Sequence, residues 1–220
     1  MFIVLEGPDS SGKTTQIKLL ESYLKDNNKK YTLLREPGGT ELGEQCRNIL
    51  LDGGLDKRSE LALFFAARAD LVNKEILTKK NLEFVICDRY VDSTVAYQCY
   101  GNESISEKHL KPMLEYFSCN VSPDVTFVLD VDYQTALKRM EDRKNNHYDV
   151  AGEEYFNRVH AYYQSLNGKD KYCYIDTSNL DIENVHKKII HKIANLELQL
   201  ALPIPAEYRE QSWKKSFWHY

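Results

Sequence analysis

The sequence predicts an α/β fold, in which a five-stranded parallel sheet has helices on both of its faces. Short apolar runs alternate with longer stretches of helical periodicity, and this alternation is typical of parallel sheets built from strand–helix–strand units. Of the 220 residues, 42% are hydrophobic and 28% are charged, which indicates one folded domain rather than a disordered chain. The net charge of −4 argues against a nucleic-acid partner, and no apolar run is long enough to cross a membrane.

The first half of the chain contains three expected strands. Residues 2–5 form an uninterrupted apolar run, which is typical of a strand buried on both faces. Ile17, Leu20 and Leu24 then recur at helical spacing, so a helix is expected after this strand. In order, the expected elements are strand 2–5, helix 13–25, strand 31–34, helices 41–51 and 59–79, and strand 84–87.

The second half of the chain continues the alternation. Pro123 leads into another apolar run, and Ile182, Val185 and Ile189 begin a stripe that makes the last expected helix amphipathic. In order, the expected elements are helices 93–100 and 106–117, strand 124–129, helices 133–144 and 153–166, strand 172–175 and helix 182–196. Ligands of such sheets bind outside the carboxyl ends of the strands.

The end of the chain differs from the rest in composition. Both tryptophans lie in the last eight positions, and Pro203 and Pro205 separate a short aromatic and basic tail. We therefore expect a domain over residues 1–202 and an extension over residues 203–220, for which packing or disorder is the simplest interpretation. The five cysteines form no C-x-x-C pair, which favours reduced thiols and a cytoplasmic location.

A glycine-rich segment after the first strand matches the phosphate-binding pattern G-x-x-x-x-G-K-[ST] at every fixed position. Its backbone N–H groups and the start of the next helix suit a triphosphate, and Lys13 can reach the β- and γ-phosphates. A chance glycine-rich turn is the alternative, and the strand–helix context argues against it. The residues expected to bind ATP are Gly7, Pro8, Asp9, Ser10, Ser11, Gly12, Lys13, Thr14 and Thr15.

Motifs outside the phosphate-binding loop, or P-loop, and the length of the chain indicate which kind of P-loop protein this is. A GTPase needs an N-K-x-D motif, which the sequence lacks, whereas a small kinase fits the length. Asp88 and Arg89 follow the third expected strand. Asp88 is placed to hold Mg²⁺ through water or to order Lys13 and Thr14, and Arg89 is placed beside the transferred phosphoryl group. The alternative is an ordinary aspartate cap followed by a surface arginine.

Four linked motifs resemble those of the thymidylate kinases. They are the P-loop, the run Arg35-Glu36-Pro37-Gly38-Gly39-Thr40, the run Phe64-Phe65-Ala66-Ala67-Arg68, and Asp88-Arg89-Tyr90 leading into Ser93-Thr94-Val95-Ala96-Tyr97-Gln98. The resemblance covers residues 1 to about 195. It implies a P-loop kinase fold with a mobile lid, Mg²⁺-dependent transfer of phosphate from ATP to dTMP in dTTP biosynthesis, and a homodimer.

The resemblance also assigns roles to individual residues. It implies that Phe64 stacks on thymine, that Arg68 hydrogen-bonds the base oxygen O4, and that Tyr97 lies against the sugar, where it selects deoxyribose. On its own, Phe64 would be interpreted as a core aromatic residue. The implied dTMP site comprises Glu36, Arg47, Phe64, Arg68, Arg89, Thr94, Tyr97 and Gln98. The implied metal site comprises Thr14, Asp88 and Asp9, and the implied catalytic residues are Lys13, Arg89, Arg139, Arg143 and Asp9.

The catalytic arginines of this chain are expected in the lid. Some thymidylate kinases have an arginine in the P-loop where this chain has Ser10, so the chain resembles the type with lid arginines. Arg139 and Arg143 lie four residues apart on an expected helix and can face the same anion. The alternative is a solvated basic helix face.

His147 stands where an arginine of the lid is expected, and a free histidine is mostly neutral at pH 7. We therefore expect a steep loss of turnover in Arg143→Ala and a mild loss in His147→Ala. Steady-state kinetics of both variants test this, and the reverse order of the two losses would contradict it.

Two other functions stay open at this point. One is a different nucleoside monophosphate kinase or a deoxynucleoside kinase, for which Glu36 could serve as the base that a hydroxyl acceptor requires. The other is a nucleotide-gated binding protein without turnover, which would not need the acceptor pocket that Phe64, Arg68 and Arg89 suggest.

Overall fold

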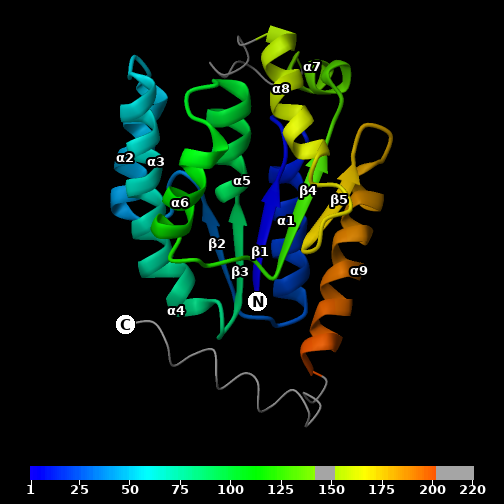
Figure 1. Ribbon diagram of the computed structural model, residues 1–220. Coiled ribbons are helices and arrows are strands. Elements are labelled where there is room, and N and C mark those ends of the chain that lie inside the picture. Colours follow the sequence, from blue (N-terminus) through cyan, green and yellow to red (C-terminus); the bar gives the residue numbers. More distant parts are fainter. Residues whose placement is uncertain (142–151, 202–220) are drawn as a thin grey trace. The chain divides into compact units, whose positions relative to one another are not determined.

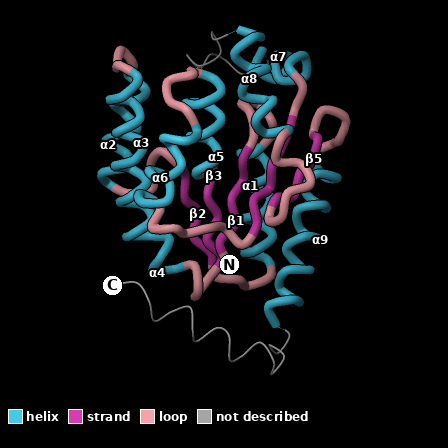
Figure 2. The backbone as a smooth tube through the Cα atoms, in the orientation of Figure 1, coloured by secondary structure: helices cyan, strands magenta, loops and turns pink. Residues whose placement is uncertain are grey.

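The computed structural model describes residues 1–141 and 152–201, and it confirms the α/β fold (Figure 1). A single sheet has five parallel strands in the order β2-β3-β1-β4-β5. The strands are β1 (Phe2–Glu6), β2 (Tyr31–Arg35), β3 (Phe84–Asp88), β4 (Val125–Asp130) and β5 (Tyr172–Asp176). Figure 2 shows the strands side by side with helices around them.

The register of the central strands determines where the polar segments after them meet. Leu5 of β1 lies opposite Asp88 of β3 and opposite Phe127 of β4. All three strands are parallel, so their carboxyl ends lie at one edge of the sheet. The P-loop, which follows β1, is therefore next to Arg89, which follows β3.

The helices largely agree with the expected ones. They are α1 (Lys13–Asp26), α2 (Glu41–Asp52), α3 (Lys57–Leu71), α4 (Leu77–Lys79), α5 (Val91–Thr94), α6 (Glu107–Phe117), α7 (Tyr133–Glu141), α8 (Gly152–Gln164) and α9 (Ile182–Ala201). The helix expected from residue 59 begins two residues earlier, because the Asp56 carboxylate accepts hydrogen bonds from the N–H groups of Arg58 and Ser59.

Two π-helical segments were not expected from the sequence. Val72–Ile76 continues α3 into α4, and Val95–Gly101 continues α5. Apolar periodicity does not distinguish a π turn from the α turns on either side of it, and π turns occur often at functional sites. The second segment contains two of the expected dTMP-site residues, Tyr97 and Gln98.

The central strands β1, β3 and β4 are buried on both faces of the sheet. On one face, Phe2 and Val4 of β1 belong to a core cluster with Leu71 and Val72 from the helix that runs through α3. Neighbouring residues of β1 point to the opposite face, toward helix α1, whose Leu20 is fully buried. Because these strands are buried on both faces, their sequences are continuous apolar runs.

The chain divides into two compact units. Met1–His186 contains the whole sheet, and a second unit begins at Lys187 within α9. The described helices include none that is long and apolar enough to span a membrane.

A buried carboxylate joins three elements of the first unit. Asp92 of α5 is 5% exposed, and its Oδ1 accepts hydrogen bonds from the hydroxyl groups of Tyr162 in α8, at 2.6 Å, and Tyr172 in β5, at 3.0 Å. Burial, together with the charge of Glu6, raises the pKa of Asp92 to about 6. The unfolded chain binds this proton less tightly, so stability from this group is fully present below about pH 4 and is lost as the pH rises through about 6.

We expect Asp92→Asn to be stabilised relative to the parent protein as the pH rises. Asparagine keeps an oxygen for both tyrosine hydroxyl groups and has no charge to bury. Thermal melts should show the melting temperature of the variant gaining about 4 °C on the parent between pH 5 and pH 8. Asp52→Asn, at an exposed position of α2, is the matched control. A pH-independent difference between Asp92→Asn and the parent would contradict the expectation.

Candidate active site

The P-loop backbone requires glycine at two positions. Gly7 has a φ of 140°, and a Cβ atom there would lie 2.0 Å from the carbonyl oxygen of Leu129. Gly12 has a φ of 98° and is the N-cap of α1, where no side chain bonds to the first amides of the helix. The start of α1 therefore offers backbone N–H groups to an anion, as a phosphate-binding loop requires.

Lys13 lies inside this loop. It is 7% exposed, and its Nζ donates hydrogen bonds to the carbonyl oxygens of Gly7, at 2.9 Å, and Pro8, at 2.7 Å. Burial and the nearby charge of Arg89 lower the pKa of Lys13 to about 8. An anionic ligand in the loop would favour the charged ammonium, so the site gains positive charge where a triphosphate would bind.

Arg89 connects the P-loop to helix α5. It has a φ of 70°, its Nη2 lies 2.6 Å from Asp9 Oδ1, and its Nη1 donates to Gly7 O at 3.2 Å and to Ser93 Oγ at 3.1 Å. Tyr97 contributes its ring, 5.0 Å from the guanidinium carbon, and its hydroxyl group, which donates to Asp9 Oδ2 at 3.1 Å. Several fixed contacts therefore orient this guanidinium group.

Asp9 is negatively charged in this setting. Burial by itself would raise the pKa of its carboxyl, but the charges of Arg89 and Lys13 outweigh that effect and lower the pKa below its usual value. Both carboxylate oxygens accept hydrogen bonds, one from Arg89 and one from Tyr97. The structure thus brings together three expected site residues, Asp9, Arg89 and Tyr97.

Arg68 and Glu36 form a buried ion pair at the other end of the site. Arg68 is 1% exposed, and its Nε and Nη2 donate to Glu36 Oε2 at 2.9 and 2.5 Å. Nη2 also donates to Thr94 Oγ1 at 2.8 Å and to Tyr90 O at 3.1 Å. Burial raises the pKa of Glu36, and the charge of Arg68 works against this rise.

One nitrogen of this arginine is unused. Arg68 Nη1 and Glu36 Oε1 are buried and have no hydrogen-bond partner in the part of the chain that the structure describes. Unsatisfied buried polar atoms are costly, so their presence points to a ligand or water at this place. A free guanidinium N–H suits a carbonyl acceptor, which is the chemistry of a pyrimidine O4 atom.

The two adjacent phenylalanines of α3 have different environments. Phe65 is 1% exposed and stacks on Phe117, with ring centroids 4.7 Å apart. Phe64 is only half-buried and lies on the next position around the helix. The core aromatic residue is therefore Phe65, and Phe64 keeps a face for other contacts, as stacking on a base would require.

Gln98 and Thr94 extend the site from the α5 side. Both side chains are buried, at 3% and 2% exposure. Thr94 accepts from Arg68, and the Gln98 amide Nε2 donates to Glu60 Oε1 at 3.0 Å. Both expected residues therefore face helix α3, which also presents Phe64.

Two carboxylates at the carboxyl ends of the strands differ in the hydrogen bonds that their oxygens accept. Glu6 is fully buried, and its oxygens accept from the backbone of Tyr90, from both the N–H and hydroxyl groups of Ser93, and from the Tyr163 hydroxyl. Asp88 Oδ1, by contrast, has no partner among residues 1–141 and 152–201. No group of three or more His, Cys, Asp or Glu side chains among the described residues could hold a metal ion by itself.

The remaining expected arginines contact the backbone. Arg47 Nη1 donates to Pro37 O at 3.0 Å, against the loop that follows β2. Arg139 of α7 donates to Ser10 O at 3.2 Å and to Thr177 O at 2.7 Å, so it bridges the P-loop and the loop after β5. Arg143 and His147 lie outside the described residues.

Known proteins are similar to this chain over most of its length. The family model described as thymidylate kinase matches residues 5–189. The chain belongs to the thymidylate kinase family. The thymidylate kinase of Thermosipho melanesiensis is 39% identical over 193 residues, covering 86% of this chain and 95% of that protein. That of Wolbachia sp. subsp. Brugia malayi is 40% identical over 206 residues, covering 88% and 95%. A crystal structure of thymidylate kinase from Ehrlichia chaffeensis aligns with a TM-score of 0.70 at 36% identity, covering 88% of this chain and 98% of that one.

Two carboxylates of this family member were missed by the sequence reasoning. Glu6 looks like the last residue of a strand, and the signal that could have revealed it is a charged residue directly before Gly7 in an otherwise apolar run. Glu60 gives no such signal, because an acidic residue in the first turn of a helix is common. Its contact with Gln98 depends on how α3 packs against the segment after α5.

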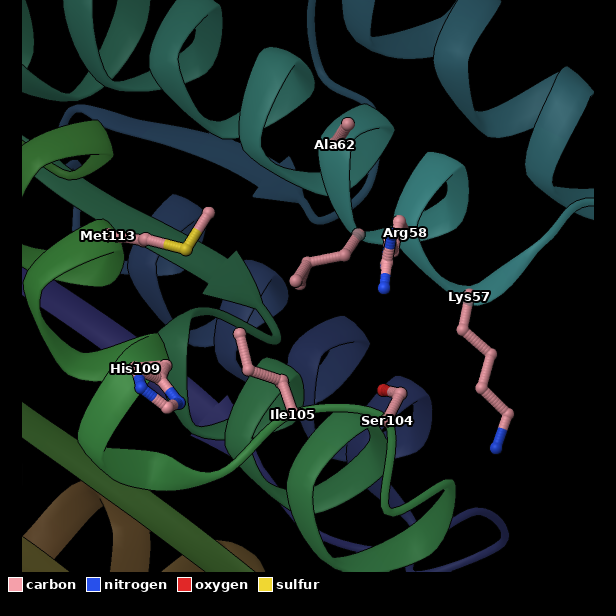
Figure 3. Close-up of a pocket in the computed structure, with 8 residues that line it drawn as sticks. Lys57, Arg58, Ala62, Ser104, Ile105, His109 and Met113 are labelled. Carbon is pink, nitrogen blue, oxygen red and sulfur yellow. The ribbon is translucent and has the colours of Figure 1, made fainter.

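The described part of the chain has two cavities near the P-loop and helix α3. A small one, of about 50 Å³, is lined by Pro8, Asp9 and Tyr97 on one side and by residues of α7 and α8, including Tyr133 and Tyr155, on the other. Figure 3 shows a larger one, of about 360 Å³, between the start of α3 and helix α6. Its lining residues include none of those expected to bind ATP or dTMP. They are Lys57, Arg58, Leu61, Ala62, Ser104, Ile105, His109 and Met113.

Proposed function

We propose that this member of the thymidylate kinase family transfers the γ-phosphoryl group of ATP to dTMP, giving ADP and dTDP for dTTP biosynthesis. The observation that carries the proposal is the position of the segment from Arg89 to Gln98. Its first residue contacts the P-loop at Gly7 and Asp9, while Thr94 and Gln98 face Arg68 and α3. One continuous segment therefore runs from the P-loop to the residues expected to bind a pyrimidine.

The transfer needs charge stabilisation more than proton chemistry. The bond from the γ-phosphorus to ADP breaks as a phosphate oxygen of dTMP forms the new bond, and negative charge spreads over the transferred group. Lys13 and Arg89 supply fixed positive charge there. The phosphate of the acceptor is already ionised near pH 7, so no protein base is required. Glu36 therefore need not act as a base, and it forms an ion pair with Arg68.

Binding and orientation come from the other expected residues. Phe64 would stack on thymine while Arg68 Nη1 donates to O4, and Tyr97, held against Asp9, would lie beside the sugar. Arg47 and Arg89 would bind the dTMP phosphate. Arg139 and Arg143 would add positive charge from the lid.

Mg²⁺ fits this site as the partner of ATP. Thr14, exposed at the start of α1, and the unpaired Oδ1 of Asp88 suit its preference for oxygen ligands, with phosphate oxygens and water completing the set. Each Asp9 oxygen accepts one hydrogen bond, so a second lone pair on either oxygen could still bind the ion. When bound, the ion neutralises charge on the phosphates.

A coupled assay of ADP release tests the proposed function. The acceptors are dTMP, dUMP, the ribose analogue of TMP, AMP and thymidine, with wild-type protein, ATP and Mg²⁺. Turnover with dTMP and little with the ribose analogue or thymidine is the expected result. Absence of turnover with dTMP would overturn the proposal, and turnover with thymidine would favour a nucleoside kinase.

We further propose a cytoplasmic homodimer. None of the five cysteines, all of which lie in the described part of the chain, forms a disulfide, in keeping with a reducing compartment. The apolar residues between Leu61 and Leu77 are mostly buried within one protomer, whereas Leu42 and Ile49 on α2 are 41% and 46% exposed. Helix α2 is therefore the better candidate for a contact between protomers, and sedimentation equilibrium of wild type and Ile49→Glu tests it. The extension over residues 203–220 stays a prediction.

A further inference from the structure

We propose that Glu60 is a positioning residue, which fixes the orientation of the Gln98 amide so that a base with an N–H group at ring position 3 is accepted. The proposal rests on the proposed function, because it concerns how the same pocket distinguishes thymine from cytosine. No motif of the sequence includes Glu60, and its role follows from a contact between two helices.

The contact is direct and partly buried. Gln98 Nε2 donates to Glu60 Oε1 at 3.0 Å, and the Gln98 side chain is 3% exposed. An ionised carboxylate has only acceptors, so a side-chain amide at this distance must present its NH₂ group. The Gln98 carbonyl oxygen Oε1 is therefore the end of the amide that is turned away from the Glu60 carboxylate.

A second contact between the same two elements lies two helical turns further along α3. Glu60, Phe64 and Arg68 are spaced by four residues, so they lie along one side of α3. Thr94 and Gln98 have the same spacing on the facing segment. Arg68 contacts Thr94 at 2.8 Å and Glu60 contacts Gln98 at 3.0 Å, which leaves Phe64 between the two contacts in the sequence of α3.

The two contacts place hydrogen-bonding groups of opposite kind in the expected base site, a donor at one point and an acceptor at another. Arg68 offers a free N–H, which suits the O4 acceptor of thymine. Gln98, oriented by Glu60, offers an acceptor, which suits the N3–H donor of thymine. Cytosine has an acceptor at N3 and an NH₂ group at position 4, so it mismatches both points. A site with fixed hydrogen-bond polarity rejects a mismatched base strongly, because its buried polar groups are left unpaired.

The test compares dTMP with 5-methyl-dCMP, which keeps the methyl group and differs only in this polarity. In Glu60→Gln, residue 60 can either donate or accept, so the Gln98 amide is free to turn. We expect KM for dTMP to rise about tenfold with kcat nearly unchanged, and the preference for dTMP, as a ratio of kcat/KM values, to fall by about tenfold. Equal losses for both substrates, or no change, would overturn the proposal.

Two further variants separate positioning from folding. Glu41→Gln removes an exposed carboxylate from the first turn of α2 and is the matched control, for which neither the preference nor the melting temperature should change. Glu60→Gln combined with Gln98→Glu exchanges the two groups, so that residue 98 can again only accept. This double variant should recover most of the preference, and a double variant as unselective as Glu60→Gln would contradict the proposal. If wild-type protein does not phosphorylate dTMP, the proposed function fails before any variant is measured.

Discussion

Replacing Arg89 with lysine is expected to lower kcat with dTMP by about a hundredfold or more, although the positive charge is retained. The guanidinium group of Arg89 contacts Asp9, Gly7 O and Ser93 at the same time, and its planar fork makes this possible. A lysine ammonium is a single point that cannot make all three contacts from the end of β3. The charge would therefore be less well placed toward the transferred phosphoryl group, where small displacements are costly.

Single-turnover and steady-state kinetics measure this effect. KM for ATP should change much less than kcat, because the P-loop and Lys13 still bind the triphosphate. Arg58→Lys, an exposed exchange of the same type in the first turn of α3, is the control and should leave kcat within about twofold. A value of kcat for Arg89→Lys within about threefold of wild type would show that charge alone suffices and would contradict the expectation.

The second large effect is expected from breaking the buried ion pair of Arg68 and Glu36. The loss should affect both the stability of the fold and the activity with dTMP, and a double variant can separate the two. Arg68→Met should destabilise the fold by about 3–5 kcal/mol, because Glu36 then keeps a buried charge without a partner. For a chain of this size, this corresponds to a fall in melting temperature of about 10 °C. The variant should also lose kcat/KM for dTMP by about a hundredfold or more, since no donor for O4 remains.

The double variant Arg68→Met with Glu36→Gln distinguishes the two consequences. Both charges are absent, so most of the lost melting temperature should return, whereas kcat/KM for dTMP should stay as low as in Arg68→Met. Differential scanning calorimetry and the ADP-release assay measure the two quantities on the same samples. Recovery of both stability and activity would show that Arg68 acts only as the partner of Glu36, and recovery of neither would show that the pair is needed for the fold itself.

Much of the site could be predicted from the sequence, and particular residues show why. The P-loop is a local structure, in which glycines at fixed positions, a lysine and a helix start determine one backbone path, so Gly7, Gly12 and Lys13 were predicted with their roles. The strands were predicted because both of their faces are apolar. Phe64 and Arg68 were placed on one side of a helix by spacing alone, and the family resemblance added the ligand.

What the sequence by itself determined is the order of elements, the parallel sheet, the phosphate loop and the family to which the chain belongs. Only the tertiary structure decided that Phe65 rather than Phe64 packs in the core, that Glu36 is the ion partner of Arg68, and that Glu60 faces Gln98. The first group follows from contacts between residues near in the chain and from apolar periodicity, which a sequence displays directly. The second follows from contacts across 52, 32 and 38 positions. Those depend on how helices pack across the edge of the sheet, and no local pattern encodes that packing.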